Sequence, residues 1–216
     1  LLSQDHHSYW TNSKAMELMK VDKNTKDIAG GVITRDKDGN PTGLFRENAK
    51  SLAEAIVPDY TVDEFKEGIL AYQKEVASYG ITAYWEPMVN TKTNLLEAYS
   101  QLDKEGKLLL KTYAGYCVNE TDNDGDPVGM LEEVEQAIKD NEGGDFEING
   151  IKLFADGVVE GHTTYLLEDY ADEPGETGEG LWTEDGMKAF VTAADAKGIT
   201  VHTHAIGDAA VKLTLD

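Results

Sequence analysis

The chain has 216 residues, of which 40% are hydrophobic, enough to build a sizeable core. Its 41 acidic and 19 basic residues give a formal net charge of -22, which argues against nucleic acid or an anionic membrane as a partner. The single cysteine, Cys117, rules out an intrachain disulfide and a cysteine-rich zinc site, and its apolar surroundings predict a core position.

The first 58 residues predict an irregular, turn-rich segment that contains one β-hairpin. Two short apolar stretches, 31–34 and 43–45, flank the turn sequence Asp-Gly-Asn-Pro at 38–41. The texture of the sequence changes at about residue 59, which we take as the start of a second domain that runs to residue 216.

A helix is predicted from Val62 to about Ser78. Thr61 followed by Glu64 is the pattern of a capping box, and Gly80 supplies the stop. Four residues at helical spacing predict the buried face: Phe65, Ile69, Tyr72 and Val76.

Strands and helices then alternate. Strands are expected at 81–85, 108–118, 150–155 and 199–204, and helices at 94–104, 128–140, 183–197 and from 208 onward. Four βα units in a row predict an α/β fold with a parallel sheet covered by helices. Because a (β/α)8 barrel takes about 250 residues, these units would form about half of a TIM-like barrel.

Two histidines end the last predicted strand. Side chains alternate along a strand, so His202 and His204 should point to the same side of the sheet. In a barrel of this kind, active sites lie at the carboxyl ends of the strands. The pair therefore indicates a metal or catalytic site, and the alternative is two hydrogen-bonded core histidines.

A lysine lies inside the preceding predicted strand. Lys152, Phe154 and Asp156 should share one face, while the residues between them face the helices. A buried ammonium needs a partner, and the sequence alone favours an ion pair with a carboxylate such as Asp156. The other interpretation is a lysine that carbon dioxide has carboxylated, so that it can bridge two divalent cations.

The segments GIKLFADGVVEGHTTYLLEDY (150–170) and VHTHAIGDAAV (201–211) resemble the YtcJ-like metal-dependent amidohydrolases, relatives of N-substituted formamide deformylase. HSYWTNSKAMELMKVD (7–22) and GNPTGLFRE (39–47) are similar to that group as well, in the same order along the chain. The resemblance implies a TIM-like barrel and a site with one or two divalent metal ions, zinc being expected. Such a site activates water to hydrolyse carbon–nitrogen bonds of small amide-type or formamide-type molecules.

The resemblance also implies roles for individual residues. Lys152 falls on the lysine that carbon dioxide carboxylates and that bridges the metals, His204 on the fifth-strand ligand, and His202 on its alternate. Five residues are candidates for the substrate pocket: His7, Trp10, Asn12, Asp156 and His162. The H-x-H pair of the family would precede Leu1, and a later histidine and the general-base aspartate would follow Asp216. The chain is thus expected to be an internal fragment, inactive by itself and without a catalytic base.

Two other functions remain open from the residues alone. One is a non-catalytic α/β binding or assembly domain with a buried network of histidine and lysine. The other is a barrel enzyme that uses Lys152 as a Schiff-base amine. No apolar stretch reaches the about 18 residues of a membrane span, so we expect a cytoplasmic protein, compatible with a homo-oligomer, although a signal peptide could precede Leu1.

Overall fold

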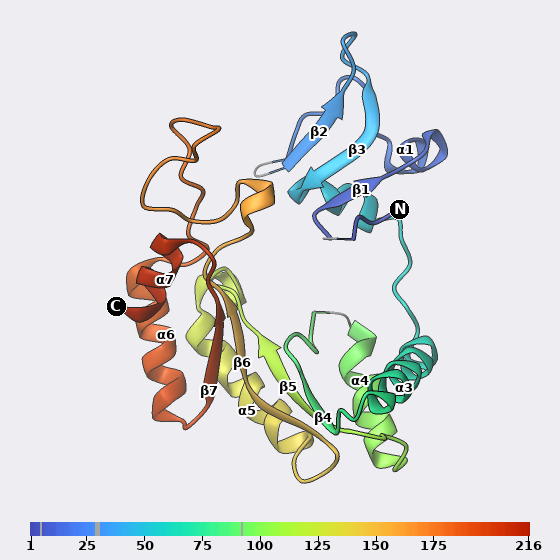
Figure 1. Cartoon of the computed structure of the whole chain (residues 1–216), viewed down its shortest axis with the longest axis vertical. Helices are drawn as coiled ribbons and strands as arrows, with labels where there is room; N and C mark the ends of the chain where they lie inside the picture. Colours follow the sequence, from blue (N-terminus) through green and yellow to red (C-terminus); the bar gives the residue numbers. More distant parts are fainter. Residues whose placement is uncertain (5, 29–30, 92) are drawn as a thin grey trace. The chain divides into compact units, whose positions relative to one another are not determined.

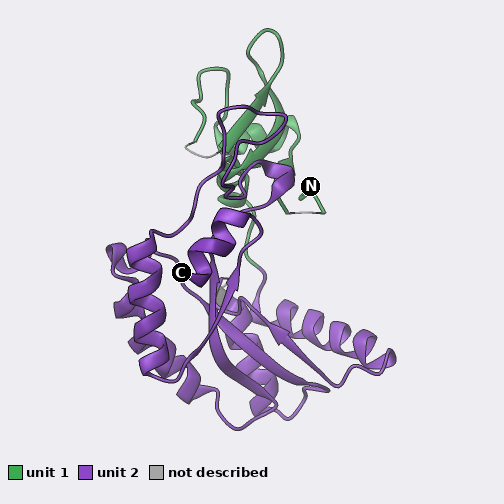
Figure 2. Cartoon of the chain, turned by 60° about the vertical axis from the view of Figure 1, so that its left-hand side comes forward, with its two compact units in different colours: residues 1–59 green, residues 60–216 purple. Residues whose placement is uncertain are grey.

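The computed structural model describes residues 1–4, 6–28, 31–91 and 93–216. The chain divides into two compact units, Leu1–Asp59 and Tyr60–Asp216, drawn in different colours in Figure 2. Each unit has its own group of buried apolar residues, and each is described here by itself.

The first unit is a small antiparallel sheet with short helices. Its elements are β1 (Ser8–Trp10), α1 (Ser13–Met19), β2 (Gly31–Arg35), β3 (Pro41–Glu47), the 3-10 turn η1 (Asn48–Lys50) and α2 (Ser51–Glu54). The strand order is β1-β3-β2. The predicted hairpin is confirmed as β2 and β3, whereas β1 was not foreseen because three residues carry too little alternation to predict a strand.

The second unit contains the four predicted βα units. Its strands are β4 (Ala83–Glu86), β5 (Lys111–Cys117), β6 (Phe146–Phe154) and β7 (Thr200–His204). Its helices are α3 (Val62–Ser78), α4 (Thr93–Lys104), α5 (Leu131–Asp140), α6 (Glu184–Ala196) and α7 (Asp208–Leu215), with the 3-10 turns η2 (Asn123–Gly125), η3 (Pro127–Met130) and η4 (Val159–Gly161). All strand pairs are parallel, in the order β4-β5-β6-β7.

This arrangement is a curled, four-stranded part of a TIM-like barrel, as Figure 1 shows. The helices pack on one face of the sheet, where Ile151 and Leu153 of β6 are fully buried together with Leu102, Val134 and Phe190 of the helices. The opposite face carries Lys152 of β6 and His202 of β7, which are opposite each other in the strand register. Strand alternation therefore divides β6 and β7 into a helix-facing set and a set that faces the inside of the curl.

Helix α3 begins as predicted but buries a different set of residues. The Thr61 hydroxyl accepts from the backbone N–H of Glu64, and the Glu64 carboxylate accepts from that of Thr61, which completes the capping box. The expected burial of Tyr72 is wrong, because this residue is 49% exposed, whereas Gln73 is fully buried. In the part of the chain that the structure describes, no helix has the length and apolar character needed to cross a membrane.

Candidate metal centre

Lys152 and the two histidines lie on neighbouring strands near their carboxyl ends. In the β6–β7 register, Lys152 is opposite His202 and Phe154 is opposite His204. Burial is the main cause that holds the pKa of His202 below its usual value, and the charges of Lys152 and His204 act in the same direction. The structure thus brings all three proposed metal ligands to one face of the sheet.

Trp85 shows how strongly the sheet curls. Trp85 belongs to β4. In a flat sheet, β4 and β7 would lie three strand spacings apart, which is about 14 Å. Its ring nevertheless lies 4.7 Å from that of His202, measured between centroids. Gly115 of β5 permits this, since a Cβ there would lie 2.7 Å from the indole. No local pattern in the sequence points to Trp85, because its contact with His202 depends on the curl of the sheet.

The hydrogen bond of His204 fixes which ring nitrogen is free. Its Nε2 lies 2.9 Å from the backbone carbonyl oxygen of Gly157, and its ring centroid lies 5.1 Å from that of Phe154. A carbonyl oxygen only accepts, so Nε2 carries a hydrogen. In the neutral form of the ring, Nδ1 would then have the lone pair that can bind a cation.

Lys152 is buried, and among the described residues no carboxylate forms the ion pair that the sequence favoured. The residue is 5% exposed, and its Nζ lies 4.3 Å from the centroid of the Phe154 ring. Burial lowers the pKa of the Lys152 ammonium. The prediction of a pair with Asp156 is wrong, because that residue lies beyond the strand end and its carboxylate binds backbone N–H groups there.

Asp156 joins two loops. It is 0% exposed, and its carboxylate accepts from the backbone N–H groups of Tyr165, Ile206 and Gly207 over 2.8–3.0 Å. Its Oδ1 lies 3.8 Å from Nε2 of His204. Asp156 has no exposed surface with which to contact a substrate, although it lies beside the proposed ligand.

Each of the other candidates for the pocket is described within its own unit. His162, in the loop after β6, binds Glu173 and lies 3.3 Å from Asp172, and the Glu173 carboxylate raises the pKa of its imidazole. His7, Trp10 and Asn12 belong to the first unit. There His7 lies 3.0 Å from Glu47, Trp10 is 65% exposed, and Asn12 caps α1 by accepting from the Ala15 N–H.

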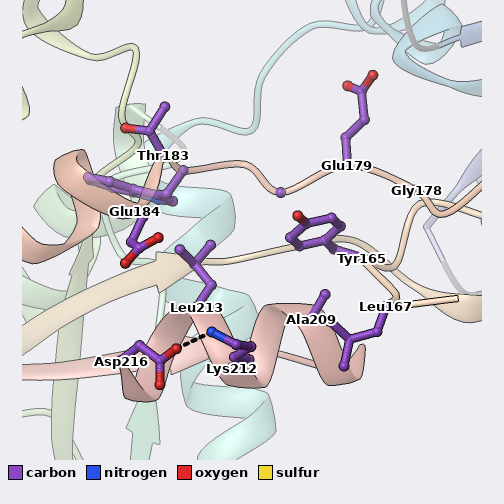
Figure 3. A pocket seen from close by; sticks show the side chains of 12 residues that line it. Tyr165, Leu167, Gly178, Glu179, Thr183, Glu184, Ala209, Lys212, Leu213 and Asp216 are labelled. Atoms are coloured by element: carbon purple, nitrogen blue, oxygen red, sulfur yellow. Dashed lines mark hydrogen bonds and ion pairs between the residues drawn. The ribbon is translucent and has the colours of Figure 1, made fainter.

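A cavity of about 630 Å³ lies between the loop after β6 and helix α7. Figure 3 shows the Tyr165 ring, Leu213 and the Lys212–Asp216 ion pair around it. None of the three proposed ligands lines this cavity. The cavity is therefore separate from the candidate metal centre.

The donor set suits a divalent cation only in part. Within the described ranges, no group of three or more His, Cys, Asp or Glu side chains is placed to hold a metal ion. His202 and His204 supply two imidazoles, and Lys152 becomes an oxygen donor only when it is carboxylated. A catalytic zinc site usually has three protein ligands, so these residues fit such a site as part of its shell.

Comparisons with known proteins identify the family and the fold of this chain. The model of the Amidohydrolase family matches residues 1–216. YtcJ of Bacillus subtilis is 29% identical over 213 residues, which cover 97% of this chain and 38% of YtcJ. N-substituted formamide deformylase of Arthrobacter pascens is 24% identical over 225 residues, which cover 100% of this chain and 40% of the deformylase. The chain thus spans less than half the length of these relatives.

A solved structure shares the fold. It is an uncharacterized metal-dependent hydrolase from Pyrococcus furiosus, with a TM-score of 0.67 and 28% identity over 98% of this chain and 41% of that protein. The family match extends over the whole chain, and the resemblance to YtcJ-like proteins is confirmed. The chain belongs to the amidohydrolase family.

Proposed function

We propose that this chain is part of a metal-dependent hydrolase, to which it contributes Lys152 and His204 as ligands, with His202 as a further one. The observation that carries the proposal is the convergence of these three side chains on one face of β6 and β7, at the carboxyl ends of the strands. The family and the name of the Pyrococcus relative point to the same chemistry.

Carboxylation of Lys152 would add an oxygen donor to the two imidazoles. The neutral amine adds to carbon dioxide and forms a carbamate, with release of one proton to water. The product is an anion with two oxygen donors, which a zinc ion stabilises. His204 would hold the ion through Nδ1, because its Nε2–H is bound to the Gly157 carbonyl.

Zinc in such a shell supplies a Lewis acid that lowers the pKa of a bound water toward neutrality. Other residues of this chain hold the proposed ligands in place and orient them. Trp85 packs on the His202 ring, and Phe154 lies between Lys152 and His204. These contacts limit the rotamers of all three ligands, which keeps the site organised before substrate arrives.

The proposed substrate is a small molecule with an amide-type or formamide-type carbon–nitrogen bond. The family and the formamide deformylase support this class. Since His7, Trp10 and Asn12 match the family motif in the first unit, we propose that they line the pocket entrance, and that His162 does so from the second unit.

Replacement of Lys152 in the full-length protein tests the proposal. Lys152→Ala should lower zinc affinity and amide hydrolysis more than about 100-fold, since loss of a group outside the ligand shell already costs about 10- to 100-fold. Added acetate or propionate should restore part of the activity, because it replaces the missing carboxylate. Lys111→Ala is the matched control: this β5 lysine pairs with Glu147, so zinc content should not change.

The isolated 216-residue chain gives a second comparison. Because the proposed ligand set contains three donors and no residue is proposed as its general base, this chain should bind zinc weakly and show no turnover. Stoichiometric zinc with turnover equal to the full-length protein would contradict this expectation. If the full-length protein itself holds no zinc and hydrolyses no amide, the non-catalytic binding domain becomes the better interpretation.

A further inference from the structure

Two loops meet beside His204. One follows β6, runs from about 155 to 183 and forms a wall of the cavity in Figure 3. The other, residues 205–207, connects β7 to α7. Their contacts involve the motif Ala-Ile-Gly-Asp, to which the proposed ligand set gives no role.

Asp156 makes the first set of contacts. It lies at the start of the long loop, and its carboxylate accepts from Tyr165 in the same loop and from Ile206 and Gly207 in the short one. Because the carboxylate is fully buried, these three bonds compensate for its desolvation, and water cannot replace them without opening the structure.

Asp208 and Gly207 add further contacts between the loops. Asp208 Oδ1 accepts from the backbone N–H of Leu167 at 2.9 Å. At Gly207, a Cβ would lie 1.8 Å from the backbone oxygen of Tyr165, so only glycine allows this approach. Ala210 donates its backbone N–H to the same oxygen at 3.3 Å. We call Asp156, Gly207 and Asp208 the loop clamp.

The loop clamp also reaches the proposed ligand. His204 donates to the carbonyl of Gly157, the residue that follows Asp156, and its Nε2 lies 3.8 Å from the Asp156 carboxylate. A shift of the long loop at Gly157 would therefore break the bond that orients the His204 ring.

We propose that Asp156 and Asp208 are positioning residues, which hold the loop after β6 against the start of α7 and thereby fix the orientation of His204. This inference rests on the proposed function for the role of His204. It replaces direct contact with substrate as the role of Asp156. It also gives a physical reason for the Gly-Asp pair after the histidine motif.

The test uses Asp156→Asn and Asp208→Ala in the full-length protein. In Asp156→Asn, an amide NH2 faces one or more of the N–H donors that the carboxylate bound, so at least one bond becomes a donor–donor contact. Asp208→Ala removes a partly solvated bond at an exposed residue, and so provides a readout if the buried substitution fails to fold. Asp185→Ala is the matched control, since Asp185 is also an acidic residue in the first turn of a helix.

Two measurements are needed. Hydrogen–deuterium exchange should rise at least about 10-fold in peptides that contain Tyr165, Leu167 and 205–209, and stay within about 2-fold in α3. Zinc affinity, measured by chelator competition, should fall about 10- to 100-fold, with kcat lowered and KM little changed. The control should alter neither exchange nor affinity.

The outcomes separate the two proposals. Faster exchange in the two loops with unchanged zinc affinity would overturn the positioning role and leave the proposed function intact. Faster exchange throughout the protein would show a merely structural role and overturn it as well. A wild-type protein without zinc would contradict the proposed function, and the loop exchange alone would then show whether the clamp exists.

Discussion

Single residues in this chain are constrained by contacts that cross several strands. Gly115 is the clearest case, since the indole of Trp85 occupies the space where a side chain would stand. Trp85 in turn donates its indole N–H to Asn149 at 2.9 Å and packs on His202. The position of the Trp85 ring beside His202 thus depends on the absence of a Cβ at Gly115, which lies two strands away from His202.

Gly115→Ala should destabilise the chain. The new Cβ would lie 2.7 Å from both the Trp85 ring and the Pro87 carbonyl oxygen, and overpacking of this kind costs about 1–3 kcal/mol. Urea unfolding measures the change. Gly68→Ala is the control, because nothing lies within 4 Å of its Cβ and alanine is favoured inside a helix by about 1 kcal/mol. Equal effects of the two substitutions would show that the indole does not occupy this place.

His162 gives a pH-dependent prediction. Glu173 and Asp172 face its imidazole, and the Tyr170 ring lies tilted against it, with 4.5 Å between the ring centroids. The Glu173 carboxylate, which is its main partner, raises the pKa of His162 above 6.5. Because the folded pKa is raised, the contact stabilises the loop fully below pH 6.5 and loses its effect as the pH rises through the folded pKa.

An NMR titration of the His162 ring measures this. Glu173→Gln should lower the pKa toward 6.5. It should destabilise the chain most between the pKa of a carboxylate, about 4.3, and that of the imidazole, and little at higher pH. Glu176→Gln, in the same loop, should leave the His162 pKa unchanged. A His162 pKa at or below 6.5 in the wild type would contradict the contact.

At the scale of elements, Gln73 joins three of them. Its amide donates to Tyr84 of β4 and Thr112 of β5, and its Oε1 accepts from the Leu109 N–H at 2.7 Å. Gln73, which makes these hydrogen bonds, is 0% exposed. The side chain therefore satisfies buried backbone and hydroxyl groups where α3 crosses the start of β5.

Gln73→Met keeps the size of the side chain and removes its hydrogen bonds. We expect a loss of about 2–4 kcal/mol in the free energy of unfolding, since each buried group left unpaired costs about 1–3 kcal/mol. Gln136→Met, at an exposed position of α5, is the control and should change stability by less than about 0.5 kcal/mol. Calorimetry or urea unfolding distinguishes the two, and a cost below 1 kcal/mol at Gln73 would show that water satisfies these groups.

The hydrogen bonds of Gln73 could not be predicted from the sequence. Apolar spacing predicted α3, the pattern of Thr61 and Glu64 predicted its cap, and alternation predicted that His202 and His204 share a face, because all three depend on local geometry. The partners of Gln73, Trp85 and Asp156 come from residues 9 to 117 positions away in the sequence. A buried polar residue has no periodic signal, so its partner becomes visible only in the folded chain.

At the scale of the whole molecule, charge and strand edges act in opposite directions. The outermost strands of the larger sheet are β4 and β7, and each presents unpaired backbone groups on one side. Such edges favour pairing with another chain. The net charge of -22 opposes it, because two copies repel each other over a distance set by the ionic strength.

The isolated chain should therefore associate in a salt-dependent way. At about 10 mM salt, where the screening length is about 30 Å, repulsion should keep it monomeric; at about 1 M, where that length is about 3 Å, the edges should pair. Sedimentation velocity measures the size, and hydrogen exchange locates the contact. Amides of β4 or β7 should become protected at high salt, while those of the first unit should not. Association that is independent of salt, or protection confined to β1 or β2, would show that another surface drives it.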